Sequence, residues 1–355
     1  MQITKTEVVP ANLSVTRPVR MAGIPQIYSV TAIFVRLETN NGLCAWGAGV
    51  AHPDLTGEKP ENALQACQAA ADKSLDLHPT NIEYSLAELS PIVSVSPAAQ
   101  CAFDLAFFDL LGLAAGMPLY RLLGGFRSKI QTSITIPIST VQESVEIAHE
   151  KAAHGFRIMK IKGGENPDED VRRVRAIHRA LPFHVLRLDA DGGYTVEEAL
   201  EVARAIGNAL EFLEQPTPPG DLEGLRQVTV NSPVPILADQ STCGPDSALV
   251  LAGGKMTHGL TVKVATCGGL RGARQIDSIA RAAHLATLVG CVVEPALMIA
   301  AGLSFALSSP NVVYGDLDGY FDLENDPTHA GFTLDEGWLV SNEVPGLGCT
   351  VNLAS

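Results

Sequence analysis

The sequence lacks the features of a secreted, disulfide-bonded or membrane-spanning protein. Its seven cysteines are scattered, odd in number and never arranged as CxxC, so neither a disulfide framework nor a structural zinc site is indicated. The N-terminus has no basic segment followed by an apolar core, and no charge-free apolar run reaches the roughly 20 residues that span a bilayer. We therefore expect a soluble, cytoplasmic protein with no membrane partner.

Positive charge is also scarce. The chain has 25 Lys and Arg residues against 39 Asp and Glu residues, which gives a net charge of −14. A surface of this kind has no basic stripe to neutralise phosphates, so a nucleic-acid partner is not expected. Small molecules are the better partner class, and a homo-oligomer is expected because symmetric assembly is common among soluble enzymes.

The hydrophobic pattern divides the chain into three parts. Residues 1–125 begin with strand-like runs and a hairpin signal at Thr39 to Gly42, followed by a helical region over about 60–115. This part predicts a mixed α+β domain. From 319 to 355 the periodicity is lost, and this segment is expected to return to the first domain.

Between residues 126 and 318, short apolar runs alternate strictly with amphipathic helices, as in a barrel of parallel strands. The stretch 296–310 is the only candidate for the last crossover helix. The expected strands are 129–136, 157–162, 185–190, 210–214, 235–239, 259–264, 287–293 and 311–316.

Three acids mark the ends of successive predicted strands. Asp189, Glu214 and Asp239 are 25 residues apart, about one strand plus one helix per step. Strand ends meet at one face of a barrel, and three carboxylates without histidine or cysteine favour a hard divalent ion, above all Mg²⁺. The alternative is three separate acids that cap the following helices. Asp191 shares a strand face with Asp189, so it either assists the site or caps a loop.

Three lysines accompany these acids. Lys160 and Lys162 lie two apart on one strand and should both point inward. Because a neighbouring ammonium and partial burial lower a lysine pKa, one of the pair is expected to serve as a base near neutral pH. Lys263 approaches from the far side of the same cavity, and two bases on opposite faces of one carbon suit a racemase or epimerase. The alternative for Lys263 is a snorkelling lysine at a strand end.

Several of these segments closely resemble the enolase superfamily, in its muconate lactonising subgroup. The resemblance covers nearly the whole chain and implies an α+β capping domain over a modified (β/α)7β TIM-like barrel. It is carried by KIK, LDAD, LEQP, ADQS and VKVATCGGL in the barrel, and by PLYRLLGG at the junction of the two domains.

The resemblance also implies the chemistry of the site. One Mg²⁺ per subunit would be held by the three strand-end acids. Lys162 and Lys263 would be the acid/base groups that remove and return a proton alpha to a carboxylate, through an enediolate that the metal stabilises. Lys160 would hold the substrate carboxylate and depress the pKa of Lys162.

The last predicted strand narrows the range of possible reactions. Asp316 and Asp318 share one face at the barrel mouth, where two carboxylates can receive an ammonium. This Asp-Leu-Asp resembles the motif with which dipeptide epimerases bind the amino terminus of their substrate. N-acylamino-acid racemases and cycloisomerases remain the alternative, as does a pair of acids in a surface turn. Glu294, in CVVEP, is expected to line the site or to support it from behind.

The favoured prediction is therefore a dipeptide epimerase that inverts the alpha carbon of the second residue. Members of the subgroup that prefer an acidic second residue carry an arginine in the loop after TRPVRMA, where this chain has Ile24. We therefore expect an apolar or uncharged second residue, although Arg20 lies close by. Gln240 stands where the family often has a glutamate, and its role is left open.

Overall fold

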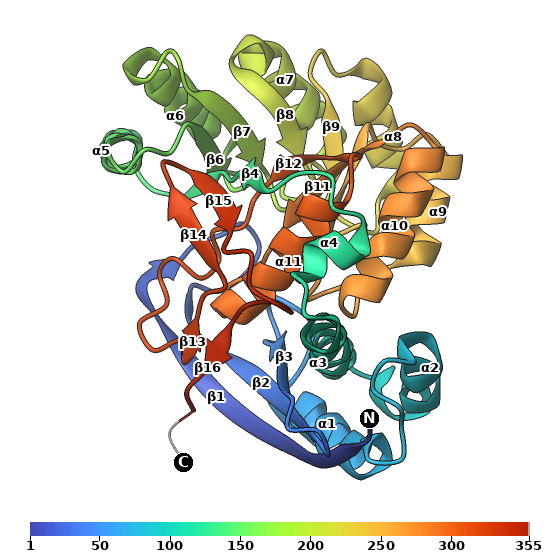
Figure 1. Cartoon of the computed structure of the whole chain (residues 1–355). Coiled ribbons are helices and arrows are strands. Elements are labelled where there is room, and N and C mark those ends of the chain that lie inside the picture. The colour runs from blue at the N-terminus through green and yellow to red at the C-terminus, as the bar shows by residue number, and fades with distance from the viewer. Residues whose placement is uncertain (354–355) are drawn as a thin grey trace.

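The N-terminal lobe is built on a three-stranded antiparallel sheet in order β1-β2-β3. In the computed structural model, which describes residues 1–353, this sheet lies beneath the barrel and is crossed by helices (Figure 1). The predicted hairpin is confirmed, since the amide of Gly42 donates to the carbonyl of Thr39 at 3.0 Å. The strands are β1 (Ile3–Val19), β2 (Ile27–Thr39) and β3 (Cys44–Ala51).

Four helices follow this sheet, and one of them, α3, joins the two lobes. Helix α3 packs on β3 so closely that a Cβ at Gly47 or Gly49 would collide with its backbone carbonyls. Its length and composition would suit a membrane span, but 72% of its apolar window is buried inside the protein, as in a core helix. The helices are α1 (Pro60–Ser74), α2 (Ile82–Val93), α3 (Pro97–Ala115) and α4 (Leu119–Leu123).

The second lobe is the predicted barrel. Its eight strands form one parallel sheet in order β12-β11-β10-β9-β8-β7-β6-β5, so sequence neighbours are also spatial neighbours. The expected fold class is confirmed. The strands are β5 (Ile134–Ile136), β6 (Ile158–Lys162), β7 (Val185–Asp189), β8 (Leu210–Glu214), β9 (Ile236–Ala238), β10 (Gly259–Lys263), β11 (Ala286–Gly290) and β12 (Val312–Gly315).

The first expected strand, 129–136, is wrong as a single element. The chain breaks at Thr132 and Ser133 into β4 (Lys129–Gln131), which pairs with the C-terminal strand β15, and β5, which joins the barrel. Thr132 and Ser133 instead contact the last barrel strand: the amide of Ser133 donates to the carbonyl of Gly315 at 3.0 Å. This contact brings the two ends of the barrel sheet together.

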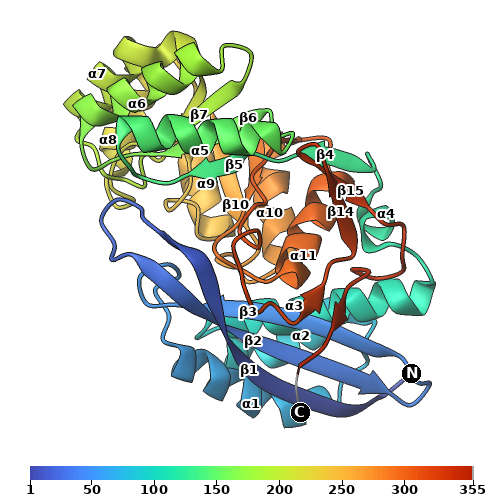
Figure 2. The same ribbon diagram turned by 90° about the vertical axis from the view of Figure 1, so that its left-hand side faces the viewer.

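Helices α5 to α10 surround the outside of the barrel (Figure 2). Two of them, α5 and α7, begin with a threonine capping box that satisfies the first free amides of the helix. The expected last crossover helix is present as α11, and its side chains are buried throughout. The helices are α5 (Val141–Ala153), α6 (Pro167–Ala180), α7 (Val196–Ile206), the 3₁₀ turn η1 (Gly207–Ala209), α8 (Leu222–Asn231), α9 (Pro245–Gly253), α10 (Leu270–Ala282) and α11 (Ala296–Ser308).

The residues after 319 contact both lobes. Val15 of β1 bridges to Leu323, and the amide of Thr16 donates to the carbonyl of Asp322 at 2.8 Å. Farther on, β15 extends a small sheet with β4 of the barrel lobe. The remaining strands of this segment are β13 (Thr328–His329), β14 (Phe332–Asp335), β15 (Trp338–Ser341) and β16 (Thr350–Val351).

A buried carboxylate of α3 ties the capping lobe to the barrel. Asp104 accepts hydrogen bonds from the amides of Leu270 at 2.6 Å and Arg271 at 3.3 Å, at the start of α10. The side chain is 1% exposed, and burial raises its pKa to about 7 against these two favourable bonds. This contact anchors the segment that follows the barrel strand carrying Lys263.

We expect the stability contributed by Asp104 to depend on pH. The folded pKa of Asp104 lies above the unfolded value of 3.8. The stability that its protonated form contributes is therefore fully present below about pH 4 and is lost as the pH rises through about 7. The total loss is at most about 4 kcal/mol. Asp104→Asn cannot ionise. Urea unfolding at about pH 5 and about pH 8 should show the variant gaining on the wild type as the pH rises.

The exposed Asp76 supplies the control, since Asp76→Asn should differ from the wild type by about the same amount at both pH values. A constant difference between wild type and Asp104→Asn would contradict the prediction.

Candidate active site

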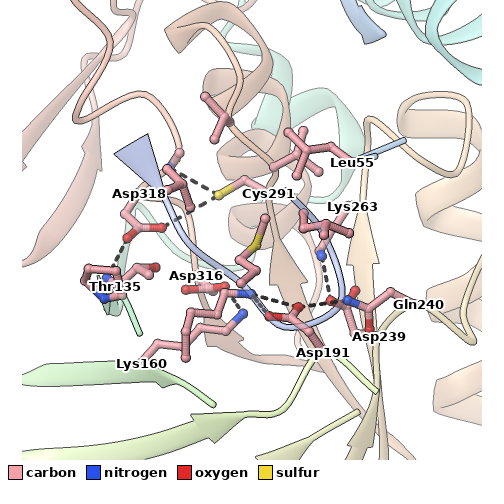
Figure 3. A pocket seen from close by; sticks show the side chains of 18 of the residues that line it. Leu55, Thr135, Lys160, Asp191, Asp239, Gln240, Lys263, Cys291, Asp316 and Asp318 are labelled. Atoms are coloured by element: carbon pink, nitrogen blue, oxygen red, sulfur yellow. Dashed lines mark hydrogen bonds and ion pairs between the residues drawn. The ribbon is translucent and has the colours of Figure 1, made fainter. Parts of the chain in front are cut away.

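Charged side chains from several barrel strands meet at the C-terminal ends of those strands. Most of these side chains line a cavity of about 600 Å³ between the barrel and the loop of the capping lobe that follows β1, and Asp189 and Glu214 are fully buried just outside its lining (Figure 3). The sequence placed these groups correctly because each one ends a strand or follows directly after it. They are Lys162 on β6, Asp189 on β7, Glu214 on β8, Asp239 after β9, Lys263 on β10 and Asp316 after β12.

The three predicted metal ligands lie together. One oxygen from each of Asp189, Glu214 and Asp239 falls within 4.8 Å of the other two, and all three side chains are buried. Glu214 Oε2 has no hydrogen bond to any of the described residues 1–353, although the Lys160 ammonium lies 3.0 Å away. An all-oxygen set with a formal charge of −3 and a free buried oxygen fits a hard divalent ion.

The carboxylates also oppose one another electrostatically. Burial and the charges of Asp189 and Asp239 raise the pKa of Glu214 to about 7, despite the attraction of Lys160. Burial acts in the same direction on Asp189, but the ammonium groups of Lys160 and Lys162 outweigh it and hold the pKa of Asp189 well below its usual range. A cation placed between the three acids would therefore be strongly attracted.

Lys160 occupies the centre of this cluster. Its ammonium lies 2.9 Å from Asp189 Oδ2, 3.0 Å from Glu214 Oε2 and 2.7 Å from Asp316 Oδ2. Burial lowers its pKa, but these acids raise it well above its ordinary value. Lys160 thus carries a positive charge that offsets the carboxylates from within the barrel.

Lys162 is held by acids on the neighbouring strand. Its ammonium donates to Asp189 Oδ2 at 2.8 Å and to both oxygens of Asp191 at 2.9 Å. Gln240 in turn donates from Nε2 to Asp191 Oδ1 at 2.9 Å, as Figure 3 shows. Through these bonds, Asp191 and Gln240 orient Lys162, the predicted base.

The prediction that the pKa of Lys162 is lowered is wrong when the protein side chains alone are considered. Burial and the charge of Lys160 do lower it, as the sequence suggested. Asp189 and Asp191, at hydrogen-bonding distance, raise it by more than that, so the net shift is upward. The sequence reasoning counted the neighbouring lysine and omitted the two acids.

Lys263 reaches the cluster from the opposite side. Its ammonium lies 2.6 Å from Asp239 Oδ2, and the side chain is 12% exposed toward the cavity. In the order of the sheet, β7, β8 and β9 lie between β6 and β10. The strands that carry the three acids are therefore flanked on one side by the strand of Lys162 and on the other by that of Lys263.

The two acids of the last strand differ in their partners. Asp316 is fully engaged, since it accepts from Ser133 Oγ at 2.6 Å and from Lys160 at 2.7 Å. Asp318 accepts from the amide of Thr135 at 2.7 Å and, at a longer 3.8 Å, from the Cys291 thiol, and it lines the cavity (Figure 3). Burial and the charge of Asp316 raise the pKa of Asp318 to about 6. Asp318 is thus the more available carboxylate.

The other two predicted site residues lie in different places. Ile24 lines the cavity from the capping lobe. Nearby, Arg20 points instead to Glu165, with a bidentate pair at 2.6 and 3.2 Å. Glu294 is fully buried, accepts from the amide of Val292 at 3.4 Å and is absent from the described cavity wall, so it stands behind the wall, which is one of the two positions expected for it.

The structure adds polar residues that the sequence reasoning missed. Thr261 donates from Oγ1 to Glu214 Oε1 at 2.7 Å. Gln215 accepts at Oε1 from the amides of Asp239 at 2.9 Å and Ser241 at 3.1 Å. These residues carry no charge and do not follow the strand-end spacing. The position of Gln215 directly after Glu214, in LEQP, was the only available signal.

Comparisons with known proteins agree with this geometry. The model described as "Mandelate racemase / muconate lactonizing enzyme, N-terminal domain" matches residues 3–124, and the one described as "Enolase C-terminal domain-like" matches residues 143–355. The chain belongs to the mandelate racemase/muconate lactonizing enzyme family of the enolase superfamily, as the resemblance implied.

Named relatives are isomerases. The L-Lys-D/L-Arg epimerase of Methylococcus capsulatus is 35% identical over 98% of this chain and 99% of its own. The hydrophobic dipeptide epimerase of Enterococcus faecalis is 34% identical over 91% of this chain and 92% of its own. The structure of the Enterococcus faecalis V583 dipeptide epimerase, complexed with Mg and L-Leu-L-Tyr, superposes with a TM-score of 0.95 at 32% identity and covers 99% of this chain and all of its own.

We expect Gln215 to be needed for both stability and metal binding. Gln215→Met would leave the buried amides of Asp239 and Ser241 without an acceptor, which should lower the free energy of unfolding by about 2–4 kcal/mol. It should also weaken binding of Mg²⁺ by tenfold or more, because Asp239 loses its support. Urea denaturation and calorimetric titration with Mg²⁺ measure the two effects.

Gln142→Met is the matched control. Gln142 is exposed on α5 and bonds only Glu146, at 2.9 Å, so its replacement should change the unfolding free energy by less than about 0.5 kcal/mol. Equal effects of the two substitutions would rule out the role given to Gln215.

Proposed function

We propose that this protein is a Mg²⁺-dependent dipeptide epimerase that inverts the alpha carbon of the second residue of its substrate. The observation that carries the proposal is the order of the strands: three acids on β7, β8 and after β9, flanked by Lys162 on β6 and Lys263 on β10. A binding module has no need of two ammonium groups on opposite sides of one small site.

The cofactor proposed for the three acids is one Mg²⁺ ion. The solved dipeptide epimerases of Enterococcus faecalis and Methylococcus capsulatus, similar to this chain over nearly their full length, are complexed with Mg. When bound by Asp189, Glu214 and Asp239, Mg²⁺ would supply positive charge to a substrate carboxylate as negative charge builds on it.

The chain's own lysines would move the proton. Lys162 and Lys263 reach the cavity from β6 and β10, so one can take the alpha proton while the other returns a proton to the opposite face. Lys160, with its ammonium fixed among three carboxylates, would attract the substrate carboxylate and the charge of the enediolate. Asp191 and Gln240 would hold Lys162 in position.

The amino terminus of a dipeptide would bind at the last strand. Asp318 offers the cavity a carboxylate whose partners are uncharged, the amide of Thr135 and the Cys291 thiol, whereas Asp316 is already paired with Lys160. An ammonium placed there would gain a charge-assisted hydrogen bond. Asp318 would be the main contact, and Asp316 would add charge from behind it. Glu294, behind the wall, would act only as a support.

The second residue would meet an apolar surface. Ile24 and Leu55 of the capping lobe line the cavity, and Arg20 is held by Glu165 rather than directed inward. An apolar or uncharged side chain would bury area here without leaving a charge unpaired. Replacing Ile24 with Arg should shift the preference toward acidic second residues. A cytoplasmic location and a homo-oligomeric state stay predictions.

Exchange of the alpha proton tests the proposal directly. The purified protein, with Mg²⁺ and pooled L,L-dipeptides in D₂O, should add one deuterium to dipeptides with apolar second residues, as measured by mass spectrometry. EDTA should abolish the exchange, and excess Mg²⁺ should restore it. Lys162→Met and Lys263→Met should each stop epimerisation, because each would remove one of the two proton carriers.

The controls separate the competing functions. Exchange with N-acyl amino acids but with no dipeptide would replace the proposal with an N-acylamino-acid racemase. Conversion of a muconate without exchange would indicate a cycloisomerase, and absence of any turnover would indicate a binding protein.

Asp318→Asn should distinguish dipeptides from substrates without an amine. Loss of the carboxylate charge should lower kcat/KM for a dipeptide by about 10- to 100-fold, because a charge-assisted hydrogen bond is lost. For the N-acetylated form of the same dipeptide, which has no ammonium, kcat/KM should differ little between the wild type and Asp318→Asn. An equal loss for both substrates would contradict the proposed ammonium contact.

A further inference from the structure

Four lysines line the cavity, and one of them has no part in the chemistry described above. Lys151 lies in the last turn of α5, and its side chain is only 6% exposed. The residue one helical turn before it, Ile147, lines the same cavity, so this face of α5 forms part of the wall.

Lys151 differs from the other three lysines in its partners. Lys160, Lys162 and Lys263 each have a carboxylate oxygen within 2.8 Å. The nearest carboxylate to Lys151 in the described structure is Glu150, at 3.9 Å, and Glu150 is 40% exposed and shared with Arg17. The Lys151 ammonium also makes no hydrogen bond to any residue among 1–353.

An aromatic ring is the main neighbour of the Lys151 ammonium. Its Nζ lies 4.8 Å from the centroid of the Phe321 ring, which is itself held edge-on by Phe156. A cation–π contact offsets part of the cost of removing an ammonium from water, and it uses none of the three N–H donors, which are free to bind a group in the cavity. A buried cation of this kind is completed by an anion in the cavity.

The position of Lys151 indicates which part of a ligand it meets. Phe321, whose ring contacts the Lys151 ammonium, lies one turn after Asp318 in the chain, and its amide donates to the Asp318 carbonyl at 2.9 Å. Lys151 therefore borders the segment that carries the carboxylate proposed to hold the substrate ammonium. Helix α5 follows β5, which is at one end of the strand order. Because the barrel closes, β5 lies beside β12, on the side away from β9 and β10. This is the side of the cavity that the first residue of a dipeptide would occupy.

We propose that Lys151 is a specificity-determining residue that selects dipeptides with a carboxylate side chain, glutamate or aspartate, on the first residue. This inference rests on the proposed function and adds the substrate class to it. Two other acids, Asp54 and Asp322, line the cavity, and both are less buried than Lys151. Of the cavity-lining lysines, Lys151 is the one with no carboxylate closer than 3.9 Å among the described residues.

A pair of nearly isosteric substrates tests this inference. L-Glu-L-Leu and L-Gln-L-Leu differ at the first residue only by the charged group, so the ratio of their kcat/KM values isolates the charge. We expect the wild type to favour L-Glu-L-Leu by about 10- to 100-fold, the effect of one charge-assisted hydrogen bond. Lys151→Met should bring the ratio close to one, and Lys151→Arg, which keeps the charge, should retain part of the preference.

Lys129→Met is the matched control. Lys129 is exposed on β4, where it stacks on Trp338 outside the cavity, so its replacement should leave the ratio unchanged. Thermal unfolding of each variant verifies that it is folded before its ratio is compared.

Each other outcome has a defined meaning. Turnover of both substrates with a wild-type ratio near one, or the same ratio in Lys151→Met, overturns the role of Lys151 and leaves the proposed function intact. If Lys151→Met instead changes the ratio of L-Leu-L-Glu to L-Leu-L-Gln, the lysine serves the second residue and the assignment to the first is wrong. If no dipeptide, L-Ala-L-Leu included, is epimerised, the proposed function and this inference both fail.

Discussion

The mutual repulsion of three buried carboxylates is the constraint on which the site depends. Asp189, Glu214 and Asp239 are brought within 4.8 Å of one another by three adjacent strands. Three like charges in a buried space are unfavourable unless cations offset them. The lysines of β6 and β10 lie beside the acids and supply these cations. The same electrostatic balance that keeps the fold stable therefore creates a place for a divalent ion.

The barrel and the capping lobe contribute different properties to the site. The barrel fixes charged groups at strand ends, where backbone hydrogen bonds on both sides hold them rigidly. The capping lobe adds the apolar loop that contains Ile24 and closes the cavity above those charges. Helix α3 and its buried Asp104 connect the two lobes, so the loop has a defined position over the barrel.

Much of the polar network consists of residues that orient others. Gln215 fixes the amide of Asp239, Asp191 fixes the ammonium of Lys162, and Gln240 fixes Asp191. Residues of this kind give little indication of their role in the sequence, because each is a residue type that is common in ordinary loops. Their importance follows from burial, where an unpaired donor or acceptor is costly.

The sequence by itself determined the barrel and the charged residues of the site. Strand and helix alternate with a regular spacing, so a group that ends a strand must lie at the common face. Tertiary structure alone decided that 129–136 is divided between two sheets, that Glu294 stands behind the wall, and that Lys162 has its pKa raised. These features depend on contacts between residues far apart in the chain, such as Ser133 with Gly315. Periodicity carries no information on such contacts, whereas it indicates where the site-bearing strands β6 to β10 end.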